Sequence, residues 1–187
     1  MAEQHWGFDR EVLRPFLADA EIAIEFGIGT GLNLPAYDPE TEILGADLSA
    51  SMLDQAQVKA RRMGQKLLSR AGKVRDLGWD YTDFDVGLAT WFFSVTPTPE
   101  TDLHTLLTLV KKGGKVVIVD HFAESRRGLR QLMGNLNHRV NNRNPYRNLK
   151  PWLLTAPVRT EIEIERTLMQ TGQSFDRSPQ LFVIRII

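Results

Sequence analysis

The chain has 187 residues, of which 42% are hydrophobic and 25% are charged. This composition is typical of a folded globular protein and excludes a fibrous or disordered chain. The absence of cysteine excludes disulfides, thiolate metal sites and a cysteine nucleophile. No apolar stretch approaches the roughly 18–20 residues of a membrane span, and the N-terminus lacks a signal-peptide pattern. We therefore expect one cytoplasmic domain over residues 1–187, with no bound metal ion.

The formal net charge is zero, but the charges are unevenly placed along the chain. Residues 1–60 contain eleven acids and three bases, residues 61–75 contain six bases, and residues 125–160 contain eight bases. The two basic blocks contain no acid. Solvated helix faces or a basic loop would account for them. Alternatively, the basic blocks attract an anionic partner: a phospholipid surface, a phosphorylated substrate or nucleic acid.

Hydrophobic periodicity predicts strands that alternate with helices. The first half is predicted to form a helix over 9–18 that Pro15 interrupts, strands over 22–26 and 42–48, a helix from the N-cap Ser49 to about Met63, and a short strand over 72–76. The second half is predicted to form a buried strand over 84–94, a helix over 99–110, a strand over 115–122 and short strands over 173–177 and 181–187. Such alternation indicates an α/β fold with a mostly parallel sheet, right-handed crossovers and cover on both faces.

The segment from Thr160 to Gly172 carries two conflicting signals. It alternates like a strand over 161–165. However, Thr160 followed three residues later by Glu163 forms a capping box, and Gly172 fits a C-cap. We predict a helix here.

Glycines at alternate positions follow the first predicted strand directly, at Gly27, Gly29 and Gly31. In a parallel sheet of this kind, a ligand lies beyond the carboxyl ends of the strands, beside strand one. Glycines there let the backbone approach a ligand and adopt conformations that other residues resist. A purely structural turn would also account for the glycines, so the interpretation needs further support.

Two acids at the ends of the first two strands supply that support. Asp47 follows Glu25 by 22 residues and ends the second strand, where a carboxylate can take both ribose hydroxyls. The dinucleotide fingerprint would require glycine at position 32, which is Leu32. Glu25 would repel a pyrophosphate but attract the amino group of a methionine-like tail. The site therefore suits adenosine with a zwitterionic, positively charged tail, which is S-adenosylmethionine.

Five motifs resemble the successive motifs of class I S-adenosylmethionine-dependent methyltransferases. They read EFGIGTG, GADLSASMLDQA, VRDL, DVGLATWFFSVTPTPE and LVKKGGKVVIVDHF, and the resemblance covers residues 20–125. Within that superfamily, GIGTGLNLPAYDP, FFSVTPTPE and VVIVDHF look most like bacterial phospholipid N-methyltransferases, which methylate phosphatidylethanolamine, and they are also similar to quinone C-methyltransferases. Those families usually carry an N-terminal Tyr/Trp-rich segment where this chain has MAEQHWGFDREVL, and from Arg126 onward the similarity is loose.

The resemblance implies a Rossmann-like fold with a seven-stranded, mostly parallel sheet, in which residues 20–125 bind S-adenosylmethionine. The cofactor contacts that it implies are Glu25, Gly27, Gly29 and Gly31 at the methionine part, Asp47 at the ribose, Leu48 and Met52 at the adenine ring, Asp76 and Leu77 at the adenine amine, and Thr90 and Trp91 beside the methyl sulfonium. Alternatively, Leu48 and Met52 are core residues and Trp91 is a buried aromatic, with no contact to a cofactor.

Methyl transfer requires donor and acceptor to be held in line. Aromatic faces suit a sulfonium or a methylated ammonium, and four candidates are Trp91, Phe92, Phe93 and Phe122. An amine acceptor must lose a proton, and His121 is the first candidate base, with Asp120 next. The alternative for His121 is a structural role.

The segment 125–160 is expected to cover the pocket and to choose the acceptor. Its arginines alternate with apolar residues, which suits an anionic lipid surface at the inner face of the membrane. A packed helix with a polar outer face has the same pattern, and no nucleic-acid-binding motif is recognised. Three hypotheses follow: methylation of a phospholipid headgroup amine, methylation of a small-molecule N, O or C acceptor, or cofactor binding without catalysis.

Overall fold

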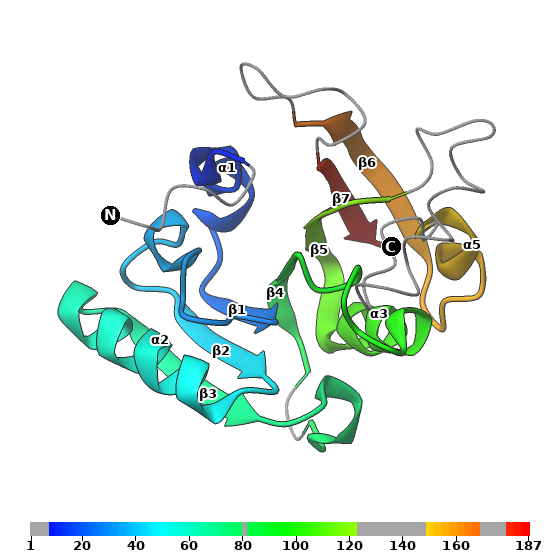
Figure 1. Cartoon of the computed structure of the whole chain (residues 1–187). Coiled ribbons are helices and arrows are strands. Elements are labelled where there is room, and N and C mark those ends of the chain that lie inside the picture. The colour runs from blue at the N-terminus through cyan, green and yellow to red at the C-terminus, as the bar shows by residue number, and fades with distance from the viewer. Residues whose placement is uncertain (1–7, 80–81, 123–148, 169–178) are drawn as a thin grey trace.

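The structure is a computed structural model that describes residues 8–79, 82–122, 149–168 and 179–187. These residues form a seven-stranded sheet in the order β3-β2-β1-β4-β5-β7-β6 (Figure 1). The strands are β1 (Ile22–Phe26), β2 (Glu42–Asp47), β3 (Lys66–Ala71), β4 (Phe84–Thr90), β5 (Val110–Asp120), β6 (Thr160–Thr167) and β7 (Gln180–Ile186). Neighbours from β3 through β5 pair parallel, and β7 pairs antiparallel with β5 and β6. The seven-stranded, mostly parallel sheet is thus confirmed.

Helices cover both faces of this sheet, as expected. They are α1 (Arg14–Leu17), α2 (Ala50–Met63), α3 (Pro99–Leu109) and α5 (Leu149–Leu154), with 3-10 turns at η2 (Arg10–Val12), η3 (Leu34–Ala36) and η4 (Val74–Asp76). Side chains alternate along each buried strand, so that Ile118 packs with α3 and α5, whereas Val117 packs with α1 and α2. Figure 1 shows α2 beside β2 and β3, and α3 and α5 on the side of β5 and β7.

Local signals placed the ends of α2 correctly. The Ser49 hydroxyl accepts a hydrogen bond from the Met52 backbone N at 3.3 Å, which confirms the N-cap of α2. Gly64 ends this helix in the left-handed conformation, with φ of 70°. The predicted helix over 9–18 is divided into η2 and α1, and Pro15 lies in the first turn of α1. Within the described residues, no helix is long and apolar enough to cross a bilayer.

The prediction for the third strand was wrong. A strand was expected over 72–76, but β3 occupies Lys66–Ala71, and the chain then turns at Gly72 into η4. The Gly72 backbone N donates to the Asp47 carbonyl at 2.9 Å, so the turn is fixed against the end of β2. β3 is an edge strand with no buried side chain, and for that reason its sequence shows no hydrophobic alternation.

The prediction of a helix from Thr160 was also wrong, because the alternation outweighs the capping box. β6 runs from Thr160 to Thr167 and pairs antiparallel with β7. Glu163 does not cap a helix but forms an ion pair with Arg185 of β7. The long-range pairing with β7 supplies backbone partners that a local capping signal cannot reveal.

Other differences concern the ends of strands. β4 ends at Thr90 rather than at position 94, and β5 begins at Val110 rather than at 115. The predicted strand over 173–177 and the greater part of the basic segment 125–160 lie outside the described residues.

Candidate functional site

A cavity of about 430 Å³ lies at the carboxyl ends of β1, β2 and β4. The chain leaves β1 toward β2 and β3 and then returns to β4 on the other side of β1, so the cavity marks the point where strand order reverses. Its walls come from Arg10, the loop 27–33 after β1, the end of β2 and the start of α2, the loop 72–75 after β3, the segment 90–98 at the end of β4 and beyond, and Asp102 of α3. The volume suits a nucleoside-sized ligand.

The three predicted glycines have positive φ values of 71°, 56° and 73° at Gly27, Gly29 and Gly31. Gly27 and Gly29 line the cavity, and a Cβ at Gly27 would stand 2.9 Å from Phe92 Cδ2. Gly31 does not line it. A Cβ at Gly31 would instead stand 2.6 Å from Leu34 Cδ1, inside the turn. The first two glycines open space at the cavity, and the third permits close packing of the turn.

Asp47 lines the cavity and is fixed by two backbone groups. Its Oδ2 accepts from the Gly29 N and its Oδ1 from the Ser49 N, both at 2.9 Å. The carboxylate therefore joins the loop after β1 to the start of α2. Leu48 and Met52 line the same wall and are 69% and 44% exposed, so neither is a core residue.

Glu25 is fully buried behind the cavity wall rather than on it. Its Oε1 accepts from Asn33 Nδ2 at 2.8 Å and its Oε2 from the Tyr37 hydroxyl at 2.9 Å. Burial raises the pKa of Glu25 to about 7, against the opposing effect of these two hydrogen bonds. Direct contact between Glu25 and a ligand stays a prediction, since the structure connects this carboxylate to the cavity through Asn33.

Asn33 and Arg10 are cavity residues that the sequence analysis missed. Besides Glu25, Asn33 Nδ2 donates to Thr90 Oγ1 at 2.9 Å, and Asn33 Oδ1 accepts from Arg10 Nε at 3.1 Å. Arg10 lies in η2, before the first motif begins in β1, and Asn33 follows the last glycine of that motif. Neither residue therefore belongs to the motif that the sequence analysis recognised. Only the tertiary structure brings them together.

Asp76 and Leu77 do not line the cavity. The Asp76 carboxylate lies 3.5 Å from Arg75 Nε, and its side chain is 60% exposed. Leu77 packs against Gly72. Their place is taken by Lys73, Val74 and Arg75, and the contact of Asp76 with an adenine amine stays a prediction.

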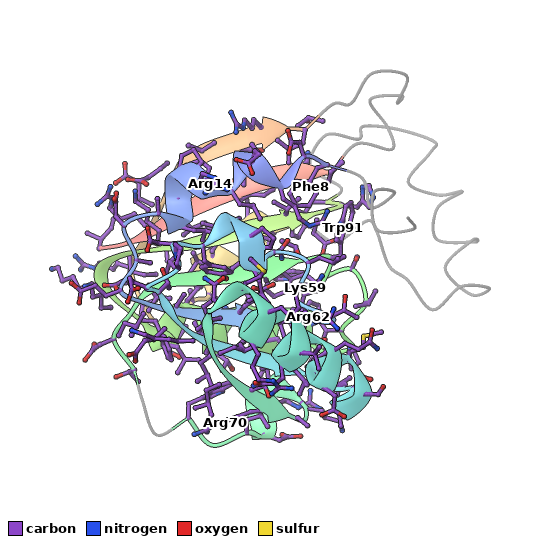
Figure 2. The ribbon with its side chains drawn as sticks, turned by 90° about the vertical axis from the view of Figure 1, so that its left-hand side faces the viewer. Phe8, Arg14, Lys59, Arg62, Arg70 and Trp91 are labelled. Atoms are coloured by element: carbon purple, nitrogen blue, oxygen red, sulfur yellow. The ribbon has the colours of Figure 1, made fainter. Side chains whose placement is uncertain are left out.

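Thr90 and Trp91 both line the cavity at the end of β4. Trp91 is one of two non-glycine residues in the described chain with positive φ, at 57°. Such strain is found at ligand sites, where surrounding structure enforces it. Its ring centroid lies 4.8 Å from that of His121 and 6.2 Å from that of Phe8, and its Nε1 is buried without a hydrogen-bond partner. Figure 2 shows Phe8 and Trp91 on the same side of the molecule.

Neither candidate base lines the cavity. Asp120 is fully buried, its Oδ2 accepts from the Ser94 N at 2.9 Å, and its Oδ1 accepts from the His121 N at 2.7 Å. Burial raises the pKa of Asp120 to about 6. The His121 ring packs on Trp91, and Trp91 is the member of this pair that lines the cavity. A catalytic role for either residue stays a prediction.

Of the four aromatic candidates, Trp91 and Phe92 line the cavity. Phe93 and Phe122 do not line it and are buried in the core that packs on α3. Among the described residues, no group of three or more His, Asp or Glu side chains is arranged to hold a metal ion.

Comparisons with known proteins agree with this geometry. Residues 24–118 match the family of methyltransferase domains. The chain is 33% identical over 154 residues to a phosphatidylethanolamine N-methyltransferase of Cereibacter sphaeroides, and the match covers 81% of this chain and 75% of that protein.

Solved structures share the fold at low sequence identity. The YcgJ protein of Bacillus subtilis has a TM-score of 0.74 at 14% identity, over 95% of this chain and 97% of that chain. The N-methyltransferase NodS of Bradyrhizobium japonicum, solved in complex with S-adenosyl-L-homocysteine, has a TM-score of 0.70 at 13% identity, over 95% of this chain and 82% of that chain.

Proposed function

This chain belongs to the class I S-adenosylmethionine-dependent methyltransferases, and we propose that it methylates the amine of a phospholipid headgroup of the phosphatidylethanolamine type. The observation that carries the choice of acceptor is the 33% identity, over 81% of the chain, to a protein named for that reaction. The cofactor supplies a methyl group on a sulfonium.

The residues at the cavity fit this cofactor. Gly27 and Gly29 leave room that a Cβ would fill, Asp47 presents a fixed carboxylate to a ribose, and Leu48 and Met52 offer exposed apolar surface to an adenine ring. These residues would hold the cofactor with its tail toward the end of β4, where Thr90 and Trp91 lie. Such positioning is the main task in an in-line methyl transfer.

The acceptor nitrogen has to be uncharged when it attacks, so a group must take its proton. We propose His121 for this role, because its ring lies against Trp91, which lines the cavity. The unperturbed imidazole pKa lies near neutrality, which suits a base. Trp91 would also stabilise the positive charge that moves to the acceptor nitrogen.

The cavity mouth supports an amphiphilic acceptor. Val95, which follows β4, exposes 50% of its surface beside the cavity, and Arg75, which also lines the cavity, donates to Thr98 Oγ1 of the same segment. Apolar side chains next to cations match a lipid whose headgroup carries a phosphate. The part of the arginines over 125–150 in attracting an anionic membrane stays a prediction, because most of that segment lies outside the described residues.

The test is incubation of the protein with S-adenosylmethionine that carries a labelled methyl group and with phosphatidylethanolamine vesicles, followed by separation of lipid and aqueous fractions. We expect label in the lipid fraction, and more of it when the vesicles also contain an anionic lipid. Phosphatidylcholine vesicles, whose headgroup nitrogen is already fully methylated, are the control for nonspecific carry-over.

Absence of lipid label with both vesicle compositions would refute the phospholipid acceptor. Label in a small aqueous product from a lysate would then favour a small-molecule N, O or C acceptor. Asp47→Ala provides a second control, since loss of the proposed ribose contact should abolish labelling of any acceptor.

A further inference from the structure

The buried carboxylate of Asp120 joins two segments that follow neighbouring strands. Its Oδ2 accepts from the Ser94 N at 2.9 Å, and its Oδ1 accepts from the His121 N at 2.7 Å. The Ser94 hydroxyl donates to the same carboxylate. Ser94 lies in the loop after β4 and His121 follows β5, and these strands pair in the sheet (Figure 1). Asp120 therefore ties the loop after β4 to the end of β5.

The two segments carry the rings at the end of the cavity where the acceptor is proposed to bind. Trp91 stands three residues before Ser94, and His121 directly follows Asp120. The centroids of the Trp91 and His121 rings are 4.8 Å apart. The Trp91 N also donates to the Val119 carbonyl at 2.9 Å. The relative position of the two rings thus depends on how the loop after β4 is fastened to β5.

Trp91 has little polar support of its own. In the described part of the chain its Nε1 is buried without a hydrogen-bond partner, so the indole is held by packing and by its backbone. That backbone has a positive φ of 57°, a conformation that persists only where surrounding structure enforces it. The bonds from Asp120 to Ser94 supply such enforcement on the far side of the loop.

We propose that Asp120 is a positioning residue for methyl transfer, which holds the Trp91 and His121 rings against each other at the acceptor end of the cavity. Asp120 does not line the cavity, so it acts through these rings and not on a substrate. The sequence analysis had considered it as a second candidate base. The proposal rests on the proposed role of His121 and is independent of which acceptor is methylated.

The test is NMR of the imidazole protons in the whole protein. The chain has four histidines, and the His121 signal is the one that His121→Gln removes. The ring current of Trp91 displaces this signal in the wild type, and Trp91→Leu gives its position without that ring. Asp120→Asn replaces one acceptor oxygen by a donor, so one of the two backbone N–H groups loses its partner. We expect the His121 signal to move toward its position in Trp91→Leu.

Asp85→Asn is the matched control. Asp85 also binds two backbone N–H groups, those of Glu21 and Ile22, both at 2.9 Å, but it lies at the start of β4 and away from the cavity. This substitution should lower stability and leave the His121 signal in place. Should Asp120→Asn fail to fold, as judged by circular dichroism, Asp120→Glu serves instead, since its longer side chain displaces both oxygens and should also move the signal.

Kinetics with whichever acceptor is labelled adds a second readout. Misplacement of the two rings should lower kcat roughly 10- to 100-fold in Asp120→Asn, whereas calorimetry should show S-adenosylhomocysteine bound within about twofold of the wild-type affinity. An unmoved His121 signal, an equal movement in Asp85→Asn, or a loss of cofactor affinity as large as the loss of kcat would overturn the proposal. The NMR measurement contains no acceptor, so a negative vesicle assay with a displaced His121 signal would remove the lipid acceptor and keep the role of Asp120.

Discussion

Two buried carboxylates, Glu25 in β1 and Asp120 at the end of β5, differ in what holds them. Both are fully buried, and burial raises the pKa of each. Side-chain donors hold Glu25, namely Asn33 and Tyr37, whereas the backbone N–H groups of Ser94 and His121 hold Asp120 together with the Ser94 side chain. The difference teaches that a carboxylate bound to a side chain of the cavity wall can orient that wall, whereas one bound largely by backbone N–H groups fixes the path of a loop.

The largest expected effect comes from Glu25→Ala, which leaves the Tyr37 hydroxyl without its acceptor and the Asn33 amide with Thr90 Oγ1 as its acceptor. A buried donor without a partner costs about 1–3 kcal/mol and each lost hydrogen bond about 0.5–1.5 kcal/mol, so the free energy of unfolding should fall by about 2–4 kcal/mol. Urea denaturation measures this fall, and calorimetry at a permissive temperature should show weaker cofactor binding. Asp120→Asn should lower stability without weakening cofactor binding, and the reverse result would break the comparison.

The pH dependence of stability should separate the two carboxylates. Folding raises the pKa of Asp120 from 3.8 to about 6 and that of Glu25 from 4.5 to about 7. The folded protein therefore binds these protons more tightly than the unfolded chain, so the contribution of these two groups to stability is greatest at low pH and falls as the pH rises through these values. For Asp120 the fall is on the order of 3 kcal/mol and ends near pH 6.

Asp120→Asn should flatten the fall between pH 4 and pH 6, and Glu25→Gln should flatten it up to about pH 7. Chemical denaturation of each variant at half-unit pH steps, referred to the wild type, isolates each contribution. A wild-type curve that instead rises over this range, with both variants parallel to it, would show that burial does not control these groups.

A smaller effect should distinguish the glycines after β1. Gly31→Ala places a Cβ 2.6 Å from Leu34 Cδ1 at a positive φ, so it combines backbone strain with overpacking, at about 2–3 kcal/mol. Gly29→Ala meets nothing closer than 4.0 Å and should cost only the strain of about 1–2 kcal/mol. Thermal melts rank the two, whereas cofactor titration should show the larger loss for Gly29→Ala, which lines the cavity.

The smallest effect should follow Glu163→Gln in β6, the edge strand of the sheet beside β7. Its ion pair with Arg185 joins β6 to β7 at the surface, where such pairs contribute about 0.2–1 kcal/mol. The loss should shrink further in high salt. Equilibrium unfolding at low and high salt tests this, and a loss comparable with that of Glu25→Ala would contradict the distinction between buried and surface carboxylates.

The sequence by itself determined the α/β class, the glycine turn, the N-cap of α2 and the place of Asp47 at the end of β2. These depend on local chemistry: a positive φ favours glycine, an N-cap needs a hydroxyl near its own helix, and an acid that ends a strand beside the first loop lines the cavity. The family motifs within residues 20–125 are local in the same sense, so the sequence was sufficient to identify them.

Only the tertiary structure decided the rest. Pairing with β7 made a strand of Thr160–Thr167 against its own capping signal, and an edge position hid β3 from hydrophobic periodicity. Packing also set Glu25 behind the cavity and brought Arg10 to Asn33, 23 residues away in sequence. Contacts at such separations depend on how strands and loops are placed in space, which local residue patterns do not encode.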